Sequence, residues 1–129
     1  MLYKGSYLNL SDNSGGYTLK ILNIKNKAFR SAYAKVSDIV TGVIQDYNTR
    51  KKKVKLKKKD RVSAIVVCTK KKYFKKNGIY IKFSDNICIP LLITKFIVPV
   101  ASSIFTPVFY EMRYLKRFKV VYKISGFSF

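Results

Sequence analysis

Hydrophobic positions in this chain occur in short runs that alternate with polar residues and stop at turn-forming residues. Tyr17, Leu19 and Ile21 alternate with polar neighbours, which is the period of a half-buried strand. On this pattern three early segments are predicted to be strands: residues 7–10, 17–24 and 36–44. Short strands at such close spacing are typical of a small closed or partly closed barrel, because closure removes the sheet edges that invite aggregation.

A further strand and a hairpin are predicted between residues 63 and 89. Residues 64–67, with the sequence AIVV, form a short apolar run between polar residues, as expected of a buried strand. Asn77-Gly78 supplies the chemistry of a tight turn, and Ile79, Ile81 and Phe83 then alternate on one face. The tip of this hairpin carries several lysines.

The hydrophobic period changes near the C-terminus. Thr106 can cap a helix and Pro107 suits its first turn, while Val108, Met112 and Leu115 are spaced along one helical face. We therefore predict a helix over residues 107–117, a return to strand over 118–124 and a loosely held tail over 126–129. The length predicts one domain over residues 1–129, with the barrel over about 1–98 and a C-terminal helical region over about 99–129.

Charge is the strongest feature of the composition. The chain has 27 Lys and Arg against 6 Asp and Glu, which gives a formal net charge of +21 and an isoelectric point near 10.1. Self-repulsion on this scale destabilises an isolated compact domain, so it favours a polyanionic partner that neutralises the field. The candidate RNA-binding residues lie in two basic runs on either side of the strand predicted at 64–67: Arg50, Lys51, Lys52, Lys53, Lys55, Lys57, Lys58 and Lys59, then Lys70, Lys71, Lys72, Lys75 and Lys76.

A membrane role is less favoured than nucleic-acid binding. Basic runs that bind membranes usually lie on tails or amphipathic helices, whereas these runs lie between predicted strands. The apolar region 87–110 is interrupted by Pro90, Lys95 and Pro99, so it does not approach the about 20 residues of a spanning helix. The N-terminal segment MLYKGSYLNL has the pattern of neither a signal peptide nor a transit peptide. No membrane insertion is predicted.

Catalytic chemistry is not indicated by the sequence. Cys68 and Cys88 lie in apolar runs without a CxxC partner, so we interpret them as small buried hydrophobes. The chain has no histidine, which is the commonest general base, and most of its carboxylates fall in turns where they accept backbone hydrogen bonds. We predict no enzyme, no metal site and no cofactor.

Several segments together resemble the universal large-subunit ribosomal protein fourteen family. They are LNLSDNSGG at 8–16, YAKVSDIV at 33–40, KKKDRVSAIVVCTKK at 57–71, the NG…F…DNICI pattern at 77–89 and IFTPVFYEMR at 104–113. The resemblance implies a mainly β fold, with a five-stranded β-barrel, a projecting β-ribbon and short C-terminal helices. It also implies a structural protein of the large ribosomal subunit that binds rRNA, without cofactors, near the face that meets the small subunit.

The resemblance further implies particular partners: large-subunit rRNA, neighbouring large-subunit proteins, small-subunit rRNA across the intersubunit face, and the ribosomal silencing factor. The family's Gly-Thr-Arg, which contributes to intersubunit and silencing-factor contacts, is matched here by Ala101, Ser102 and Ser103, so this chain has lost that cationic side chain. The usually polar loop before them is apolar here over residues 91–98. Because an exposed apolar loop marks an interaction site, we predict that Leu92 or Phe96 contacts another ribosomal protein. The alternative is that the loop folds back onto its own barrel in an enlarged core.

Two further departures concern turns. Where the family usually has glycine before an aspartate, this chain has Ser37 and Lys59. Either these turns adopt a different geometry, or a non-glycine residue adopts an unfavourable backbone conformation.

Amino-acid usage bears on the compartment. Lys, Ile, Tyr, Phe and Asn have AT-rich codons and are abundant here, which together with the start of the chain favours an organelle-encoded protein. We predict the mitochondrial ribosome in the matrix, with the plastid or the cytoplasm of an AT-rich bacterium as alternatives.

The alternative function is a free single-strand nucleic-acid-binding β-barrel protein, which would need exposed aromatic residues on one face of the barrel. Phe83 and Phe105 are instead interpreted as core residues. The two functions differ in whether the protein sediments with large subunits.

Overall fold

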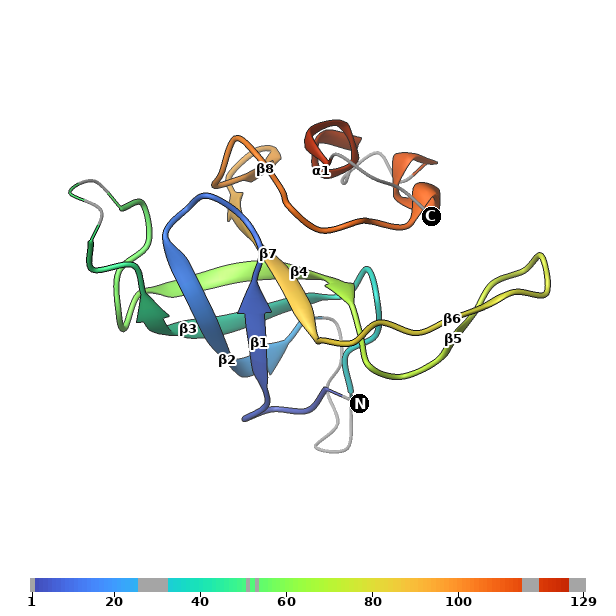
Figure 1. Ribbon diagram of the computed structural model, residues 1–129. Helices are drawn as coiled ribbons and strands as arrows, with labels where there is room; N and C mark the ends of the chain where they lie inside the picture. The colour runs from blue at the N-terminus through green and yellow to red at the C-terminus, as the bar shows by residue number, and fades with distance from the viewer. Residues whose placement is uncertain (1, 26–32, 51, 53, 115–118, 126–129) are drawn as a thin grey trace.

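Five strands close into a β-barrel in the computed structural model, which describes residues 2–25, 33–50, 52, 54–114 and 119–125. They are β1 (Tyr7–Leu10), β2 (Gly16–Ile24), β3 (Ile39–Tyr47), β4 (Arg61–Cys68) and β7 (Ile87–Ile93). Successive strands pair antiparallel, and a parallel pairing of β1 with β7 closes the barrel (Figure 1). The predicted five-stranded barrel is confirmed.

The remaining elements project from the barrel or lie against it. β5 (Tyr73–Phe74) pairs with β6 (Tyr80–Ile81) in a separate ribbon, and β8 (Ile97–Pro99) extends the sheet beyond β7. The 3-10 helix η1 (Tyr110–Tyr114) and the helix α1 (Lys119–Ile124) lie together above β4 and β7 in Figure 1. The predicted ribbon and short C-terminal helices are therefore present. Within the described ranges, no helix is long and apolar enough to cross a membrane.

β4 explains why residues 64–67 are apolar without interruption. Ala64 and Val66 lie in the barrel interior, whereas Ile65 and Val67 lie in a second cluster outside it, and all four are fully buried. A strand that is buried on both faces needs apolar side chains at every position, so the alternation is lost. The second cluster, called the outer cluster below, consists of Ile65, Val67, Cys68, Ile89, Leu91, Ile104, Val108, Met112 and Val121.

The alternation predicted for β2 is wrong at one position. Leu19 and Ile21 are buried in the barrel, but Tyr17 is exposed. The ladder between β2 and β3 shifts register between Gly16 and Thr18 and again between Thr18 and Leu19. A bulge of this kind adds a residue to one strand and turns its side chain away from the face that the period predicts.

Two equivalent turns precede β3 and β4. In the first, the N–H of Asp38 donates to the carbonyl of Lys35 (3.1 Å), and the N–H of Lys35 donates to the Asp38 carboxylate (2.8 Å). The turn at 57–60 repeats both bonds, at 3.2 and 2.9 Å. Ser37 and Lys59 hold the third position with φ of 73° and 70°, where such a turn favours glycine. Ser37 and Lys59 therefore adopt the unfavourable backbone conformation, and the two turns do not change to a different geometry.

The helix predicted over residues 107–117 begins later than expected. Val108 lies in an isolated β-bridge, and η1 starts only at Tyr110. Thr106 does not cap a helix, and in the described part of the chain its buried Oγ1 has no hydrogen-bond partner. Val108 and Met112 are both buried in the outer cluster, so their spacing reflects packing rather than a continuous helix. Leu115 lies outside the described residues.

The strand predicted over residues 118–124 is wrong, because residues 119–124 form α1. Val121 is buried in the outer cluster. A short β-branched run does not by itself distinguish a strand from a buried helix, and tertiary packing decided between them. Residues 118 and 126–129 lie outside the described part of the chain.

The apolar segment 91–98 is a hairpin rather than a loop. β7 and β8 pair antiparallel, with Ile93 opposite Ile97. Leu91 is buried and Ile97 packs against the outer cluster, so the fold itself absorbs part of this segment. Four apolar side chains of the hairpin remain exposed: Leu92, Ile93, Phe96 and Val98.

Candidate nucleic-acid interface

The two basic runs lie at opposite ends of β4. The basic loop, residues 50–59, leads into the first residue of β4, and the ribbon arm, residues 70–83, follows its last (Figure 1). β4 has 8 residues, and a strand rises about 3.3 Å per residue, so roughly 25 Å separates the two arms along the strand. Two basic arms therefore flank one core strand, as predicted, and their cations lie at two ends of the barrel.

Leu56 anchors the basic loop. Its side chain is buried in the barrel interior, and its N–H and that of Lys55 both donate to the carbonyl of Ser14, at 3.3 and 3.0 Å. Lys55 Nζ also donates to the carbonyl of Val100 (3.0 Å). The cations of the loop that the structure describes are all exposed: Arg50, Lys52, Lys55, Lys57, Lys58 and Lys59. Lys51 and Lys53 lie outside the described residues.

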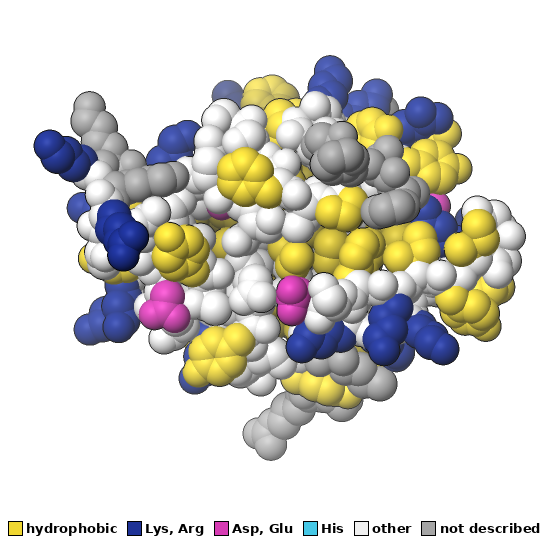
Figure 2. Space-filling model, viewed as in Figure 1, with side chains coloured by type: hydrophobic (Ala, Val, Ile, Leu, Met, Phe, Trp, Pro, Cys, Tyr) yellow, Lys and Arg dark blue, Asp and Glu magenta, His cyan; other side chains and the backbone are white. Residues whose placement is uncertain are grey.

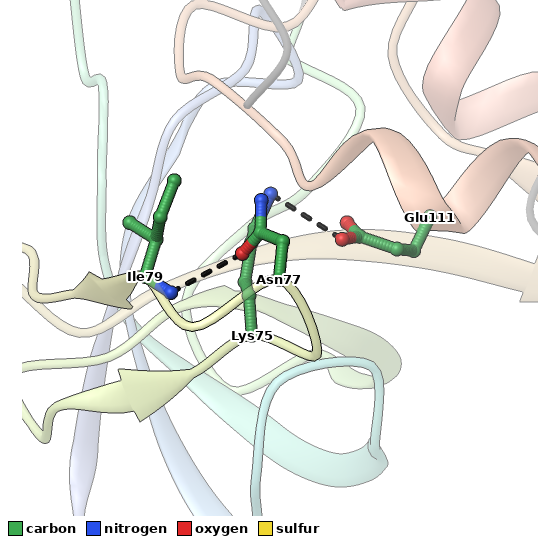
Figure 3. A network of polar contacts seen from close by, with 4 residues as sticks. All are labelled: Lys75, Asn77, Ile79 and Glu111. Atoms are coloured by element: carbon green, nitrogen blue, oxygen red, sulfur yellow. Dashed lines mark hydrogen bonds and ion pairs between the residues drawn. The ribbon is translucent and has the colours of Figure 1, made fainter.

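A three-residue turn closes the ribbon arm. The N–H of Gly78 donates to the carbonyl of Lys75 (3.0 Å), and the N–H of Lys75 donates to the carbonyl of Ile79 (2.8 Å). Gly78 has φ of 87°, and the side chain of Asn77 accepts the N–H of Ile79 (3.2 Å; Figure 3). The predicted Asn77-Gly78 turn is confirmed, and its positive φ explains the glycine.

Lys75 differs from the other predicted phosphate ligands because it is only 6% exposed. Its Nζ lies 3.4 Å from Glu111 Oε1 and 5.0 and 5.3 Å from the ring centroids of Phe109 and Tyr110. Figure 3 draws the ion pair with Glu111. A desolvated ammonium over aromatic rings is attracted by their quadrupoles as well as by the carboxylate. Lys75 therefore holds the ribbon against η1, and its ammonium is already engaged.

The other predicted cations of the ribbon arm are exposed: Lys70, Lys71, Lys72 and Lys76. Lys71 Nζ lies 5.1 Å from the ring centroid of Tyr33, and Lys35 Nζ lies 5.3 Å from the same ring. Sequence reasoning missed Lys35 and Lys82, since neither belongs to a lysine run. Lys82 could have been found from the strand alternation, but only the fold brings Lys35 beside the ribbon.

The described arm cations, apart from Lys75, form no ion pair with a carboxylate of this chain. Solvated cations of this kind, concentrated at two sites and not neutralised by ion pairs, are the electrostatic footprint of a polyanion-binding protein. A family model for ribosomal protein L14p/L23e matches residues 1–126.

The chain belongs to the L14p/L23e family. This family consists of structural proteins of the large ribosomal subunit that bind rRNA and are not enzymes. The resemblance recognised in the sequence is thereby confirmed. As a member of an L14p/L23e ribosomal family, the chain is associated with ribosomes and has rRNA and ribosomal proteins as partners.

In this L14p/L23e protein, Ser102 and Ser103 are held by the side chain of Asn13. Asn13 Oδ1 accepts the N–H groups of Ser102 (3.2 Å) and Ser103 (3.4 Å), and Asn13 Nδ2 donates to Ser102 Oγ (3.0 Å). Three hydrogen bonds from one side chain fix this segment to the β1–β2 turn. Nothing in the sequence signals this role of Asn13 beyond its place in a turn.

The exposed tip of the β7–β8 hairpin carries the other residues of the predicted partner surface. Phe96 is 76% exposed and Leu92 is 57% exposed. On the face drawn in Figure 2, hydrophobic side chains lie among Lys and Arg side chains. The tip is apolar enough to mark an interaction site.

The described residues contain no group of three or more His, Cys, Asp or Glu that could hold a metal ion. Cys68 and Cys88 are buried free thiols, as predicted. Burial raises the pKa of Cys68 to about 12, and burial together with the charge of Asp12 raises the pKa of Cys88 further. Phe83 is half-buried and packs on Phe109, but Phe105 is exposed, so the core interpretation of Phe105 is wrong.

Proposed function

We propose that the protein binds large-subunit rRNA mainly through phosphate contacts made by its two basic arms. The observation that carries this proposal is that, among the described residues of the arms at both ends of β4, the exposed cations have no carboxylate partners. The proposed phosphate-binding residues are Arg50, Lys51, Lys52, Lys53, Lys55, Lys57, Lys58 and Lys59 in the basic loop, and Lys70, Lys71, Lys72 and Lys76 in the ribbon arm. Lys75 is left out because its ammonium contacts Glu111.

Lysine chemistry favours phosphates over base edges in these arms. An ammonium is a compact charge on a flexible stem, whereas specific reading of bases is mostly done by planar, bidentate groups. Arg50 is the one arginine in the proposed set. Contacts to phosphates position a protein on RNA without reading its sequence, as expected of a structural subunit component.

The separation of the arms implies two RNA segments. A span of roughly 25 Å, which follows from the rise of a strand, exceeds the Debye length of about 8 Å at physiological salt. Each arm therefore neutralises its own phosphates. Once one arm is bound, the second binds at a raised effective concentration, so the protein would fasten two segments of rRNA to one rigid barrel.

The test compares glutamine variants that remove equal charge. Lys71→Gln, Lys72→Gln and Lys76→Gln together form the ribbon variant, and Lys4→Gln, Lys25→Gln and Lys95→Gln form the control. Each phosphate contact that a variant removes should lower the slope of log Kd against log salt by about 0.7–0.9. We expect this decrease in the ribbon variant for RNAs of different sequence alike. Equal slopes in the ribbon variant and the control, or weaker binding to one RNA sequence alone, would overturn the proposal.

We propose that the apolar hairpin tip contacts a neighbouring ribosomal protein through Leu92 or Phe96. The exposed side chains are too apolar to remain in water without cost, and the ladder of β7 and β8 already satisfies the hairpin backbone. A photo-reactive residue at position 96 should cross-link to a protein in assembled subunits. If residue 96 cross-links only to rRNA or to this chain, the tip has another role.

The surface at Ser102 and Ser103 is proposed to face the small subunit and its rRNA. Its support is the family's use of this segment and the firm hold of Asn13 on it. Docking of the ribosomal silencing factor at the same place would have to proceed without the arginine that the family supplies there. Binding of that factor to large subunits carrying Ser103→Arg, compared with the natural chain, tests this role.

The proposed compartment is the mitochondrial matrix, on the codon-usage argument. Co-sedimentation of the protein with mitochondrial large subunits in moderate salt supports both the compartment and the structural role. Sedimentation with plastid or bacterial large subunits would correct the compartment alone. A protein found free of subunits would instead favour the single-strand-binding alternative.

A further inference from the structure

The ribbon arm has two different faces. Phe74 pairs with Tyr80 and Tyr73 pairs with Ile81, and the side chains of directly paired residues lie on the same face. Tyr73 packs against Phe109 with their ring centroids 4.9 Å apart, so its face is turned toward the C-terminal segment. Phe74 and Tyr80 therefore lie on the opposite face, which we call the outer face.

Two aromatic rings lie side by side on the outer face. The ring centroids of Phe74 and Tyr80 are 4.8 Å apart with the planes inclined by 49°. Phe74 is 57% exposed and Tyr80 is 66% exposed. In Figure 2 exposed hydrophobic side chains appear at the right-hand end, where Figure 1 places the ribbon, with Lys and Arg side chains beside them. A neighbouring pair of exposed rings is a ready stacking surface.

The charged residues of the ribbon arm itself are all lysines. Lys72 is two residues before Phe74, Lys82 is two residues after Tyr80, and both are exposed. Each lies one residue outside its strand, and continuing the strand alternation by that residue assigns both lysines to the outer face. Residues 70–83 contain six lysines and no Asp or Glu. Charge complementarity therefore selects an anionic partner, and the exposed rings select one that also presents flat apolar faces.

A hollow of about 210 Å³ adjoins Phe74 at the root of the ribbon. Tyr33, Lys35, Lys71 and Tyr73 also line it. Its volume is below the about 300–1,000 Å³ of pockets for drug-sized ligands, so it suits one ring system rather than a segment of folded protein. A lining that combines aromatic rings with lysine side chains fits a base whose own phosphate remains outside.

We propose that the outer face of the ribbon arm binds unpaired RNA, with one or more bases stacked on Phe74 and Tyr80 and the phosphates held by the flanking lysines. Single-stranded RNA offers unstacked bases joined by phosphates, and aromatic side chains between cations are the usual platform for them. The inference rests on the proposed rRNA binding and adds to it a contact with bases. The competing occupant is an acidic segment of a protein. Because residues 70–83 contain no carboxylate, their charge suits RNA and an acidic protein segment equally, and the experiments below distinguish the two.

The first experiment separates stacking from charge. The full-length protein is titrated with a uridine oligomer of about twelve nucleotides, which is within the site sizes of single-strand-binding barrels, and with an oligomer of the same length that lacks bases. Phe74→Ala with Tyr80→Ala should weaken binding to the uridine oligomer at least about fivefold, as expected from the contribution of one stacked base. Binding to the abasic oligomer should be unchanged. Tyr17→Ala, which removes an exposed tyrosine from the barrel, is the matched control.

The second experiment reports the contact directly. The chain has no tryptophan, so Phe74→Trp introduces a single indole at the proposed site, and Tyr17→Trp places one elsewhere. Stacking of a base should quench the indole fluorescence of the Phe74→Trp variant with the uridine oligomer but not with the abasic one. The fluorescence of the Tyr17→Trp variant should respond to neither oligomer.

The outcomes distinguish the two levels of the proposal. Equal weakening of both oligomers by the Phe74 and Tyr80 changes, or no quenching at position 74, would overturn stacking while leaving phosphate binding intact. Failure of the lysine variants to change the salt slope would remove phosphate binding itself. Unchanged RNA binding, together with cross-links from position 74 to a protein in assembled subunits, would assign the outer face to a protein partner instead.

Discussion

Replacing Lys59 and Ser37 with glycine should stabilise the protein, although both changes add backbone freedom. Both residues hold the third position of a turn with φ near +70°, and neither turn can relax easily, because each is tied to a barrel strand. The N–H of Lys59 donates to the carbonyl of Ile44 (2.9 Å), and the N–H of Ser37 donates to the carbonyl of Val66 (2.8 Å). Ile44 and Val66 are fully buried, so the strained conformations are imposed by the barrel.

The magnitude follows from two opposing terms. A left-handed conformation costs an L-residue roughly 1–2 kcal/mol, and glycine removes this cost. Glycine also raises the entropy of the unfolded chain, which offsets about 0.4–1 kcal/mol. The net gain is about 0.5–1 kcal/mol per turn. The turns lie near opposite ends of the β3–β4 pairing, roughly 20 Å apart by the rise of a strand, so the two gains should add to about 1–2 kcal/mol.

Urea and thermal unfolding of the isolated protein measure this gain. For a chain of 129 residues, the double variant should unfold roughly 3–8 °C higher, with an unchanged urea m-value. Lys58→Gly is the matched control, because it removes the same charge and adds the same freedom in the same turn, but Lys58 has no positive φ to relieve. We expect Lys58→Gly to be destabilising. If Lys59→Gly is no more stable than Lys58→Gly, backbone strain is not the reason for the gain.

Three other predictions test the core, the ribbon contact of Lys75 and the thiols. Val66→Asp places an unpaired carboxylate in the barrel interior and should cost more than about 3 kcal/mol of folding free energy, so ribosomes should lack the variant protein. Val98→Asp, on the exposed hairpin, is the control and should be tolerated by the isolated fold. Normal incorporation of the Val66→Asp protein into ribosomes would place residue 66 at the surface. Lys75→Met should speed amide exchange in the ribbon and cost up to about 2 kcal/mol, without changing the salt slope of RNA binding. Lys76→Met should instead lower the salt slope and leave amide exchange in the ribbon unchanged. A lower slope for Lys75→Met would mean that Lys75 contacts phosphate. Burial raises the pKa of Cys68 to about 12, so a thiol reagent at pH 8 should label the native protein no faster than the protein unfolds. The free energy of unfolding should fall above about pH 9, where the thiols ionise in the unfolded chain but not in the folded one, and it should fall less steeply in Cys68→Ala. Rapid labelling of the native protein would contradict the burial.

Family, barrel and RNA binding could be predicted from the sequence because they depend on features that persist locally. The apolar run at 64–67, the Asn77-Gly78 turn and the two lysine runs each have a physical meaning without knowledge of their neighbours. The departures at Ser37 and Lys59 could also be recognised, because the family's glycine before each turn aspartate indicates a backbone conformation that favours glycine. Only the structure shows that Ser37 and Lys59 adopt this conformation, with positive φ.

These failures share one cause, which is pairing or packing with residues distant in the sequence. Tyr17 turns outward because a bulge interrupts β2, and residues 119–124 become helical where Val121 meets the outer cluster. Neither a bulge nor a docking partner changes the local period, so periodicity alone could not reveal them.

The roles of individual lysines were decided by tertiary structure. Within one run, Lys76 is exposed and Lys75 is buried against Glu111, which is 36 positions later in the sequence. Net charge is a property of composition, and it is sufficient to predict a polyanionic partner. Which cations face that partner depends on which side chains the fold brings beside them, because an ammonium next to a carboxylate and two aromatic rings is no longer available to a phosphate.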